Sequence, residues 1–385
     1  MDTTQEQNRC LIIFSGFNDR AVIALCRQCN AFKVPFLIVS AGEFDRIYLT
    51  KYSKNVIHQR NADNLTLELI LHIFNEIKAQ TNYNHFVIAP STEYLNRFFL
   101  KERIALEKIN VQIPLVNEEL YSKVSDKSSF VRLCKDNGLR VPYETTDYLE
   151  LEFPFVIKPN TYFAKNGEVQ TKPIIVYNES VLNSIKGEYL FDDFFFQEFV
   201  PGKCLYLLFY ISTSKELTVA VSQENLIQQA NGGSMVAARV LNSNYYAITK
   251  KYLDLFELIG FTGLVMVELK MHNGEFFMIE ANPRMWGPSQ LFVDAGFPIF
   301  RNFLIDNGFE VSDFEIPFNP NAIYSWFGGL VANSTKGGTS VYYDYSSTQF
   351  MDEISLWMES DVYNRKDSRD LFNFEISPHS LNESN

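Results

Sequence analysis

The sequence of 385 residues has few cysteines, little basic charge and no long apolar segment. Its five cysteines are scattered and odd in number, which argues against a disulfide framework. The net charge of −12 argues against broad binding to a nucleic-acid backbone, although a local group of lysines could still hold a nucleotide. No stretch approaches the ~20 apolar residues of a membrane span, and no basic and apolar leader is present. We therefore expect a cytoplasmic protein with neither nucleic acid nor membrane as a partner.

Several catalytic motifs are also missing. The turn after the first apolar run begins Ser15-Gly16, but it does not continue as G-x-G-x-x-G, so a dinucleotide fingerprint is absent. Neither G-x-S-x-G nor a convincing triad is present, and we expect no covalent serine or cysteine catalysis. Cys26 and Cys29 form C-x-x-C in a helical pattern without a second pair or a histidine partner. This favours a structural role over the alternatives of a redox or metal site.

Hydrophobic periodicity divides the chain into two parts. Up to about residue 115, apolar runs at 10–14, 36–39 and 86–89 alternate with helical patterns, which predicts a small doubly wound α/β domain. From residue 153 onward strand-like runs become frequent, and turn residues separate several of them, as in an α+β region with antiparallel sheet. The expected fold class is therefore α/β followed by α+β.

The strongest functional signal is a hairpin pattern around an Asn-Gly turn at Asn273. Glu268 precedes this turn, and Glu280 and Asn282 follow it two residues apart, so their side chains share a face. Glu268 and Glu280 fall close to opposite one another, and paired carboxylates in an apolar setting need a cation such as Mg²⁺. The alternative is a pair of edge carboxylates in solvent. Arg284 follows at once and suits an oxyanion or a phosphate, or else a structural ion pair.

Two weaker signals precede the hairpin. Lys158 ends an apolar run, where a lysine needs a partner, either a nucleotide phosphate or a nearby carboxylate. Residues 194–202 read FFFQEFVPG, an apolar strand that runs into a polar pair and a Pro-Gly turn. The backbone at such a strand edge can bind an adenine base, although many strands end in this way.

In this order the segments resemble the ATP-grasp superfamily over about residues 118–305, and EANPRMWG is most similar to carbamoyl-phosphate-synthase-like members. A full carbamoyl-phosphate synthase is excluded by length, because it needs two grasp units. A biotin carboxylase is disfavoured because Gln223, Glu224 and Asn225 replace the basic residues expected there. The resemblance implies four parts: a Rossmann-like pre-ATP-grasp domain (1–115), a small lid subdomain (116–190), a C-terminal grasp subdomain (191–320) and a C-terminal extension (321–385).

The resemblance also implies roles for individual residues. Those on the nucleotide side are Lys127, Lys158, Gln197, Glu198, Phe199, Val200 and Cys204. The implied magnesium ligands are Glu268, Glu280 and Asn282. The implied catalytic or substrate-side residues are Arg284, Lys165 and Arg239, with Gly232, Gly233 and Ser234 nearby.

Two departures accompany the resemblance. Lys203-Cys204 stands where relatives carry the acid that binds the ribose, and the phosphate-covering loop 161–167 has a single glycine. Lys165 offers a charge in that loop instead.

The expected function is an ATP-dependent ligase that joins a small carboxylate to an amine through an acyl-phosphate and releases ADP and phosphate. The expected cofactors are ATP and Mg²⁺, with Mn²⁺ as a substitute, and a homodimer is an open alternative to a monomer. A thiol acceptor or bicarbonate activation on the same fold stays open. A different class of function also stays open, namely an ATP-binding regulatory or structural protein whose catalysis has decayed.

Overall fold

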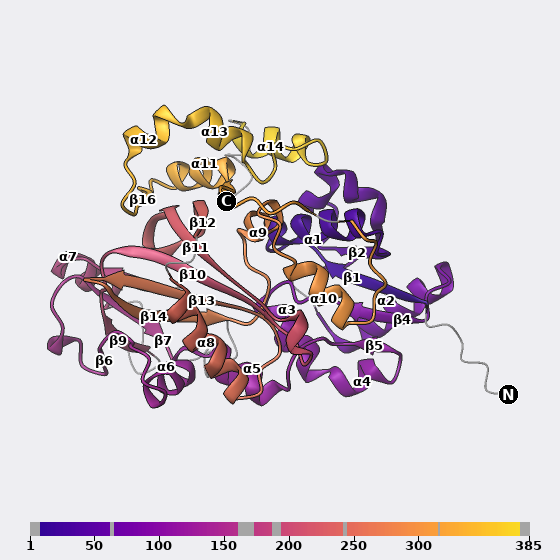
Figure 1. The fold of residues 1–385 in the computed structure, drawn as a ribbon, viewed down its shortest axis with the longest axis horizontal. Helices are drawn as coiled ribbons and strands as arrows, with labels where there is room; N and C mark the ends of the chain where they lie inside the picture. Colours follow the sequence, from indigo (N-terminus) through magenta and orange to yellow (C-terminus); the bar gives the residue numbers. More distant parts are fainter. Residues whose placement is uncertain are drawn as a thin grey trace.

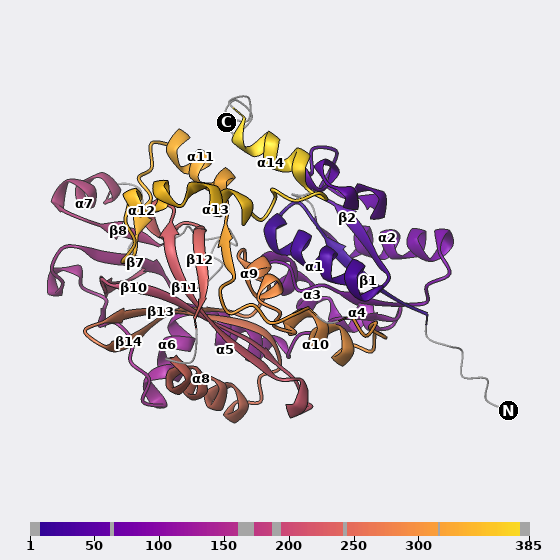
Figure 2. The same ribbon diagram turned by 45° about the horizontal axis from the view of Figure 1, so that its top comes forward.

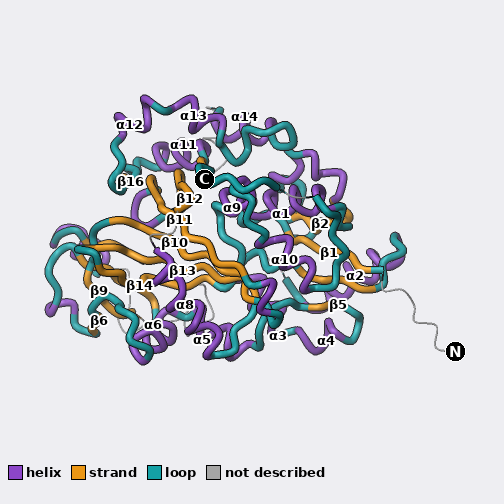
Figure 3. Tube along the Cα trace, viewed as in Figure 1, coloured by secondary structure: helices purple, strands orange, loops and turns teal. Residues whose placement is uncertain are grey.

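The computed structural model describes residues 8–61, 65–160, 173–186, 194–241, 245–314 and 316–377 of the chain. These residues form three β-sheets that follow one another along the chain. Figure 1 shows the N-terminal sheet at the right, the later sheets at the left and the C-terminal helices across the top. In Figure 3 the strands of the largest sheet run through the middle of the molecule. The predicted fold class, α/β followed by α+β, is confirmed.

The N-terminal sheet has five parallel strands in the order β3-β2-β1-β4-β5. The strands are β1 (Arg9–Phe14), β2 (Phe36–Ser40), β3 (Val56–Gln59), β4 (His85–Ile88) and β5 (Val111–Gln112). The intervening helices are α1 (Asp19–Phe32), α2 (Leu67–Gln80), α3 (Glu93–Lys101) and α4 (Arg103–Glu107), with the 3₁₀ turns η1 (Arg46–Leu49) and η2 (Lys51–Asn55). Buried apolar residues from these helices form cores with β1 and β4, which explains the short continuous apolar runs of the strands.

The small sheet has four strands in the order β6-β9-β7-β8. They are β6 (Glu144–Thr145), β7 (Phe155–Pro159), β8 (Ile174–Val176) and β9 (Phe194–Glu198). The helices of this region are α5 (Glu118–Ser125), α6 (Lys127–Asp136) and α7 (Glu179–Ile185), with the 3₁₀ turn η3 (Tyr148–Glu150). Strand β9 pairs with β7 in this sheet, so the proposed boundary at residue 190 separates strands that lie side by side.

The large sheet has seven strands, of which six follow the order β14-β13-β10-β11-β12-β15 while β16 pairs with β11. They are β10 (Lys203–Ile211), β11 (Val219–Gln228), β12 (Met235–Leu241), β13 (Gly263–His272), β14 (Glu275–Asn282), β15 (Ile323–Ser325) and β16 (Val341–Tyr342). The 3₁₀ turns η5 (Lys215–Leu217) and η6 (Ala230–Gly232) flank β11. One face packs against α8 (Tyr246–Leu258) and α6, and the other against α1, α9 (Ser289–Asp294) and α10 (Ile299–Asp306).

The C-terminal segment joins the large sheet to the N-terminal part of the chain (Figure 2). Its helices are α11 (Phe327–Thr335), α12 (Ser347–Asp352), α13 (Ile354–Glu359) and α14 (Arg369–Ile376). On α1, Arg27 donates from Nε and Nη2 to the carboxylate of Asp367 at 2.9 and 2.8 Å. From η1, Arg46 donates to Glu375 of α14 at 2.7 Å. The segment is therefore fixed to the N-terminal part of the chain by charge-assisted hydrogen bonds.

Two expectations from composition can be checked on the described residues. All five cysteines are free thiols, as expected from their scattered spacing, and the structure shows that all five are buried. In the described part of the chain, no helix combines the length and the apolar character needed to cross a membrane.

Candidate active site

The hairpin of β13 and β14 carries the residues that the sequence predicts as metal ligands. Asn273 and Gly274 form its turn, and both have positive φ angles, 52° and 78°, as a two-residue I′ turn requires. The register pairs Glu268 directly with Glu280, and Asn282 lies two residues further along β14. The predicted convergence of these three residues on one face of the hairpin is confirmed.

A β-bulge in β14 sets this register. Leu269 pairs with Met278 and Glu268 pairs with Glu280, so Ile279 is an extra residue on its strand. In an unbroken strand, Met278 and Glu280 would share a face, and Glu280 would point away from Glu268. The bulge therefore turns Glu280 towards Glu268 while Met278 stays in the core on the opposite face.

Lys158 connects the two later sheets at this bulge. It lies on β7 of the small sheet, is 3 % exposed, and donates from Nζ to the carbonyl of Ile279 at 3.1 Å. Burial and the nearby charge of Lys127 lower its pKa to about 8, although the carboxylates of Glu280, Glu144 and Glu268 act in the opposite direction. A buried ammonium with one neutral acceptor is only partly compensated, and this suits an anionic ligand such as a phosphate.

A connected cluster extends from Glu280 to the loop after β14. Lys127, the first residue of α6, places Nζ at 3.7 Å from Glu280 Oε2. Asn282 Nδ2 donates to Glu280 Oε1 at 2.8 Å, and Arg284 Nη2 donates to Asn282 Oδ1 at 3.0 Å. The structure thus brings together Lys127, Glu280, Asn282 and Arg284, with Lys158 beside them.

The two carboxylates experience different surroundings. Burial, followed by the nearby charge of Glu280, raises the pKa of Glu268. Burial also acts to raise the pKa of Glu280, but Lys127, the amide of Asn282 and Lys158 outweigh it and lower this pKa below its ordinary value. The cluster therefore keeps Glu280 ionised, whereas the negative charge of Glu268 is offset less by nearby positive groups.

The donor set of this site fits a divalent cation. One buried and one half-buried carboxylate and an amide oxygen are the hard ligands that Mg²⁺ prefers, and a cation between Glu268 and Glu280 would offset their repulsion. Nowhere in the described ranges do three Asp, Glu, His or Cys side chains form a group able to hold a metal. Asn282 and oxygen atoms from a bound ligand or water would therefore have to complete the coordination shell.

Two residues on the same face were not predicted from the sequence. Lys270 follows Glu268 by two positions on β13, and its ammonium lies 3.9 Å from the ring centroid of Tyr343. Tyr343 comes from the C-terminal segment and donates from its hydroxyl to Gln228 Oε1 at 2.6 Å. Strand alternation could have found Lys270, because residues two apart share a face. No local pattern brings residue 343 to this place.

Cys204, predicted on the nucleotide side, is fully buried beside Glu268. Its thiol donates to Glu268 Oε1 at 3.4 Å and accepts from Asn225 Nδ2 at 3.2 Å. Gln223 Nε2 in turn donates to Asn225 Oδ1 at 2.6 Å. Burial raises the pKa of this thiol well above its usual range, so the group serves as a neutral donor to a carboxylate. Its contact with a nucleotide stays a prediction.

The predicted adenine segment follows β9 and leads into the large sheet. Glu198 is held at both ends by Tyr143: its N–H donates to the Tyr143 carbonyl, and its Oε1 accepts from the Tyr143 N–H, each at 2.9 Å. Gln197 and Val200 are buried, whereas Phe199 is partly exposed. The segment is therefore anchored at its start, and its role towards adenine stays a prediction.

Two predicted residues are not brought to this cluster. Arg239 donates to Glu224 Oε2 from Nε at 2.7 Å, and its Nη2 lies 2.6 Å from the same oxygen. Glu224 pairs with Leu205, next to the residue that pairs with Glu268, so Arg239 lies on the opposite face of the sheet. Lys165, with the rest of the predicted phosphate loop, lies outside the described residues.

Residues 124–288 match a family model described as ATP-grasp domain. This part of the chain is an ATP-grasp domain. The match begins before Lys127 and ends after Arg284, so it spans both ends of the connected cluster. No curated protein matches the sequence of the chain.

Solved structures with an ATP-grasp fold cover most of the chain. The ADP complex of N5-carboxyaminoimidazole ribonucleotide synthetase has a TM-score of 0.57 at 16 % identity, covering 80 % of each chain. The biotin carboxylase domain of 2-oxoglutarate carboxylase from Hydrogenobacter thermophilus has a TM-score of 0.59 at 13 % identity, covering 81 % of this chain and 72 % of that one. The biotin carboxylase from Campylobacter jejuni reaches 0.57 at 14 % identity, covering 80 % and 72 %. At these identities the likeness shows the fold.

Proposed function

We propose that this protein is an ATP-dependent ligase that activates a small carboxylate as an acyl-phosphate and transfers the acyl group to an amine, releasing ADP and phosphate. The observation that carries the proposal is the ATP-grasp cluster itself. Glu268 and Glu280 face each other in register, and Lys127, Asn282, Arg284 and Lys158 surround them. This arrangement combines a cation site with free positive charge, which phosphoryl transfer from a nucleotide needs.

The positively charged, negatively charged and amide residues of the cluster have different proposed roles. Lys158 and Lys127 offset the negative charge of the phosphates, and Lys158 is suited to this because burial leaves its ammonium poorly solvated. Glu268, Glu280 and Asn282 would hold Mg²⁺, which would neutralise charge on the phosphate oxygens during transfer. Arg284 lies at the end of the cluster, where its guanidinium can stabilise an oxyanion on the acyl carbon.

The proposed reaction has two balanced steps. A carboxylate oxygen of the substrate attacks the γ-phosphorus of ATP, the bond to the β-phosphate oxygen breaks, and ADP leaves. The amine then attacks the acyl carbon, phosphate leaves with the bonding electrons, and the amine loses a proton. A thiol acceptor would follow the same course. The ADP and MgADP named for structurally similar proteins support the choice of nucleotide and cation, with Mn²⁺ as a proposed substitute.

A second candidate is an ATP-binding protein whose catalysis has decayed. Cys204 favours it, because this fully buried thiol stands where relatives carry an acid for the ribose. The retained Arg284 and the intact carboxylate pair oppose it, since binding alone does not require an oxyanion partner. We therefore prefer the ligase. The proposed reactants are small molecules, and a cytoplasmic homodimer is the proposed state.

The test is nucleotide turnover with Mg²⁺ and pooled small acids and amines, comparing wild type with Glu280→Gln and with the control Glu275→Gln. Glu275 lies on the same strand, but it is paired with Arg140 at the far end of the hairpin. We expect ADP and phosphate that depend on both pools, a loss of at least about 100-fold in Glu280→Gln, and little change in the control. Release of AMP and pyrophosphate would overturn the acyl-phosphate route. Nucleotide binding without turnover in any pool would favour the decayed protein.

A further inference from the structure

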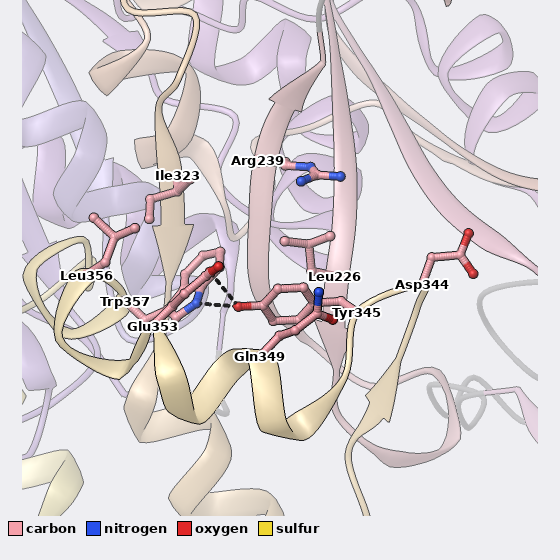
Figure 4. Close-up of a pocket in the computed structure, with 9 residues that line it drawn as sticks. All are labelled: Leu226, Arg239, Ile323, Asp344, Tyr345, Gln349, Glu353, Leu356 and Trp357. Atoms are coloured by element: carbon pink, nitrogen blue, oxygen red, sulfur yellow. Dashed lines mark hydrogen bonds between the residues drawn. The ribbon is translucent and has the colours of Figure 1, made fainter.

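A cavity of about 290 Å³ lies between the large sheet and the C-terminal helices. Its walls come from β11, β12 and β15 on one side and from the segment after β16 with α12 and α13 on the other (Figure 4). Leu226, Ile323, Leu356 and Trp357 supply apolar surface, and Arg239 and Glu353 supply charge. A volume of this size accommodates a small organic molecule.

The cavity lies on the opposite side of the sheet from the candidate active site. Arg239 pairs in register with Ile323 on β15 and with Glu224 on β11, and all three side chains therefore project from one face. Gln223, the neighbour of Glu224, belongs to the face that carries Glu268. An occupant of the cavity is thus separated from the carboxylate pair by the sheet itself, and it cannot be the reacting acid.

Arg239 lines the cavity, and one nitrogen of its guanidinium, Nη1, is available to a ligand there. Both Nε and Nη2 are directed to one oxygen of Glu224, and the side chain remains 50 % exposed. Within the described ranges, Nη1 has no hydrogen-bond partner. Glu224 is 3 % exposed and is shared with Lys203 at 3.4 Å, so its charge does not depend on Arg239 alone. A carboxylate entering the cavity can therefore accept from Arg239 without breaking the existing pair.

The floor of the cavity presents the complementary charge. The hydroxyl of Tyr345 donates to Glu353 Oε2 at 2.8 Å and accepts from Trp357 Nε1 at 2.7 Å, which fixes the tyrosine ring and the carboxylate together (Figure 4). Asp344 also lines the cavity. A cationic end near these carboxylates and an anionic end near Arg239 would each meet an opposite charge, with apolar surface between them.

We propose that this cavity binds a small zwitterion, an α-amino acid with an apolar side chain, as an effector. The carboxylate is held by Arg239, the ammonium by Glu353, and the side chain packs against Trp357 and Leu356.

The effector role follows from a series of ion pairs that connects the cavity to the nucleotide side of the sheet. Arg239, Glu224, Lys203 and Asp344 form a continuous series of ion pairs, and Lys203 begins β10 directly after the predicted adenine segment. Asp344 follows Tyr343, whose ring lies over Lys270 on the face of Glu268. An occupant held by Arg239 engages one end of this series, whose members Lys203 and Asp344 border the proposed nucleotide site. This part of the inference rests on the proposed function, whereas binding in the cavity does not.

Titration calorimetry on the full chain tests the site with L-leucine and L-phenylalanine as probes, and with 4-methylpentanoate and 3-methylbutylamine, which each lack one charged group. We expect binding of the amino acids and at least about tenfold weaker binding of both analogues. Arg239→Gln and Glu353→Gln should each weaken amino-acid binding at least about tenfold. The control Arg140→Gln, which breaks another exposed arginine–carboxylate pair, should leave it unchanged. No binding of either amino acid, or equal binding to Arg239→Gln, overturns the site.

The effector role has its own measurement. The Kd for ADP is determined first without amino acid and then at saturating L-leucine, and a change of threefold or more that is absent in Arg239→Gln supports the coupling. An unchanged Kd for ADP overturns the effector role but does not affect the proposal that the cavity binds an amino acid. Failure to bind ADP under any condition contradicts the proposed function instead, and the two failures are thereby distinguished.

Discussion

Lys158→Met should stabilise the protein without ligand and weaken its binding of nucleotide. Burial is the main reason that the pKa of Lys158 falls from 10.5 to about 8, so keeping the ammonium charged at pH 7 costs about 3 kcal/mol of folding free energy. Methionine removes that cost but leaves the carbonyl of Ile279 without its donor, a loss of about 1 kcal/mol. For a chain of 385 residues, the net gain of about 2 kcal/mol corresponds to a rise in Tm of about 2–3 °C.

The pH dependence gives this prediction a sign that can be checked. Since the pKa of Lys158 is lower in the folded protein, the unfolded chain holds more protons between about pH 8 and 10.5. The wild type therefore gains stability as the pH rises through this window, and the variant lacks that gain. The difference in Tm between variant and wild type should shrink from pH 7 to pH 10, as measured by scanning fluorimetry. The exposed Lys101 at the end of α3 provides the control Lys101→Met, for which no such trend is expected.

Nucleotide binding should change in the opposite direction. A charge-assisted hydrogen bond to phosphate contributes about 1.5–3 kcal/mol, so Lys158→Met should weaken ADP binding about 10- to 150-fold. A variant that is less stable than wild type at pH 7, or whose Tm difference does not change with pH, would refute the reasoning. Either result would mean that the contacts of the ammonium outweigh its burial.

Two further predictions concern the frame around the site. Asp367→Asn should lose about 1–3 kcal/mol of stability, because Arg27 and Tyr52 both donate to this carboxylate. Burial acts to raise the pKa of Asp367, but Arg27 and the hydrogen bonds lower it to about 2, so the contribution is complete above pH 3.8 and disappears as the pH falls towards 2. In thermal melts from pH 5 to 2.5, the Tm of the wild type should fall towards that of Asp367→Asn. The control Asp254→Asn, which removes an exposed pair with Lys250, should change the Tm little at any pH. Gly202→Ala should destabilise the protein by at least about 1–3 kcal/mol and weaken ADP binding, because φ is 107° and the new Cβ would collide with the carbonyl oxygen of Met271. Gly260→Ala also places alanine at positive φ but has open space around it, so an equal loss in both variants would contradict the collision.

The parts of the fold that could be predicted from sequence are those with local signals. The Asn-Gly turn fixed the hairpin, and alternation placed Glu280 and Asn282 on one face. A single helical pattern runs through residues 94–109, but the structure has two helices there, α3 and α4, separated at Glu102, which has φ −95° and ψ 9°. Apolar periodicity continues across such a break, so the pattern could not reveal it.

The parts that could not be predicted depend on residues far apart in the chain. Tyr343 reaches Lys270 because β16 pairs with β11, and nothing near position 343 specifies that pairing. Arg239 was expected with the catalytic residues, since its position along the chain resembles that in relatives. Its face of the sheet relative to Glu268 depends on the successive registers from β12 through β11 and β10 to β13, and these are not encoded in any one strand alone.

The bulge at Ile279 gives the hairpin an unusual response to a change in chain length. Removing this one residue would leave Leu269 paired with Met278 and Glu268 paired with Glu280, now in an uninterrupted ladder. The carboxylate pair would be retained, whereas the carbonyl that accepts from Lys158 would be gone. A single-residue deletion, which in most strands reverses every side chain beyond it, would here separate the cation site from the contact that joins the two sheets.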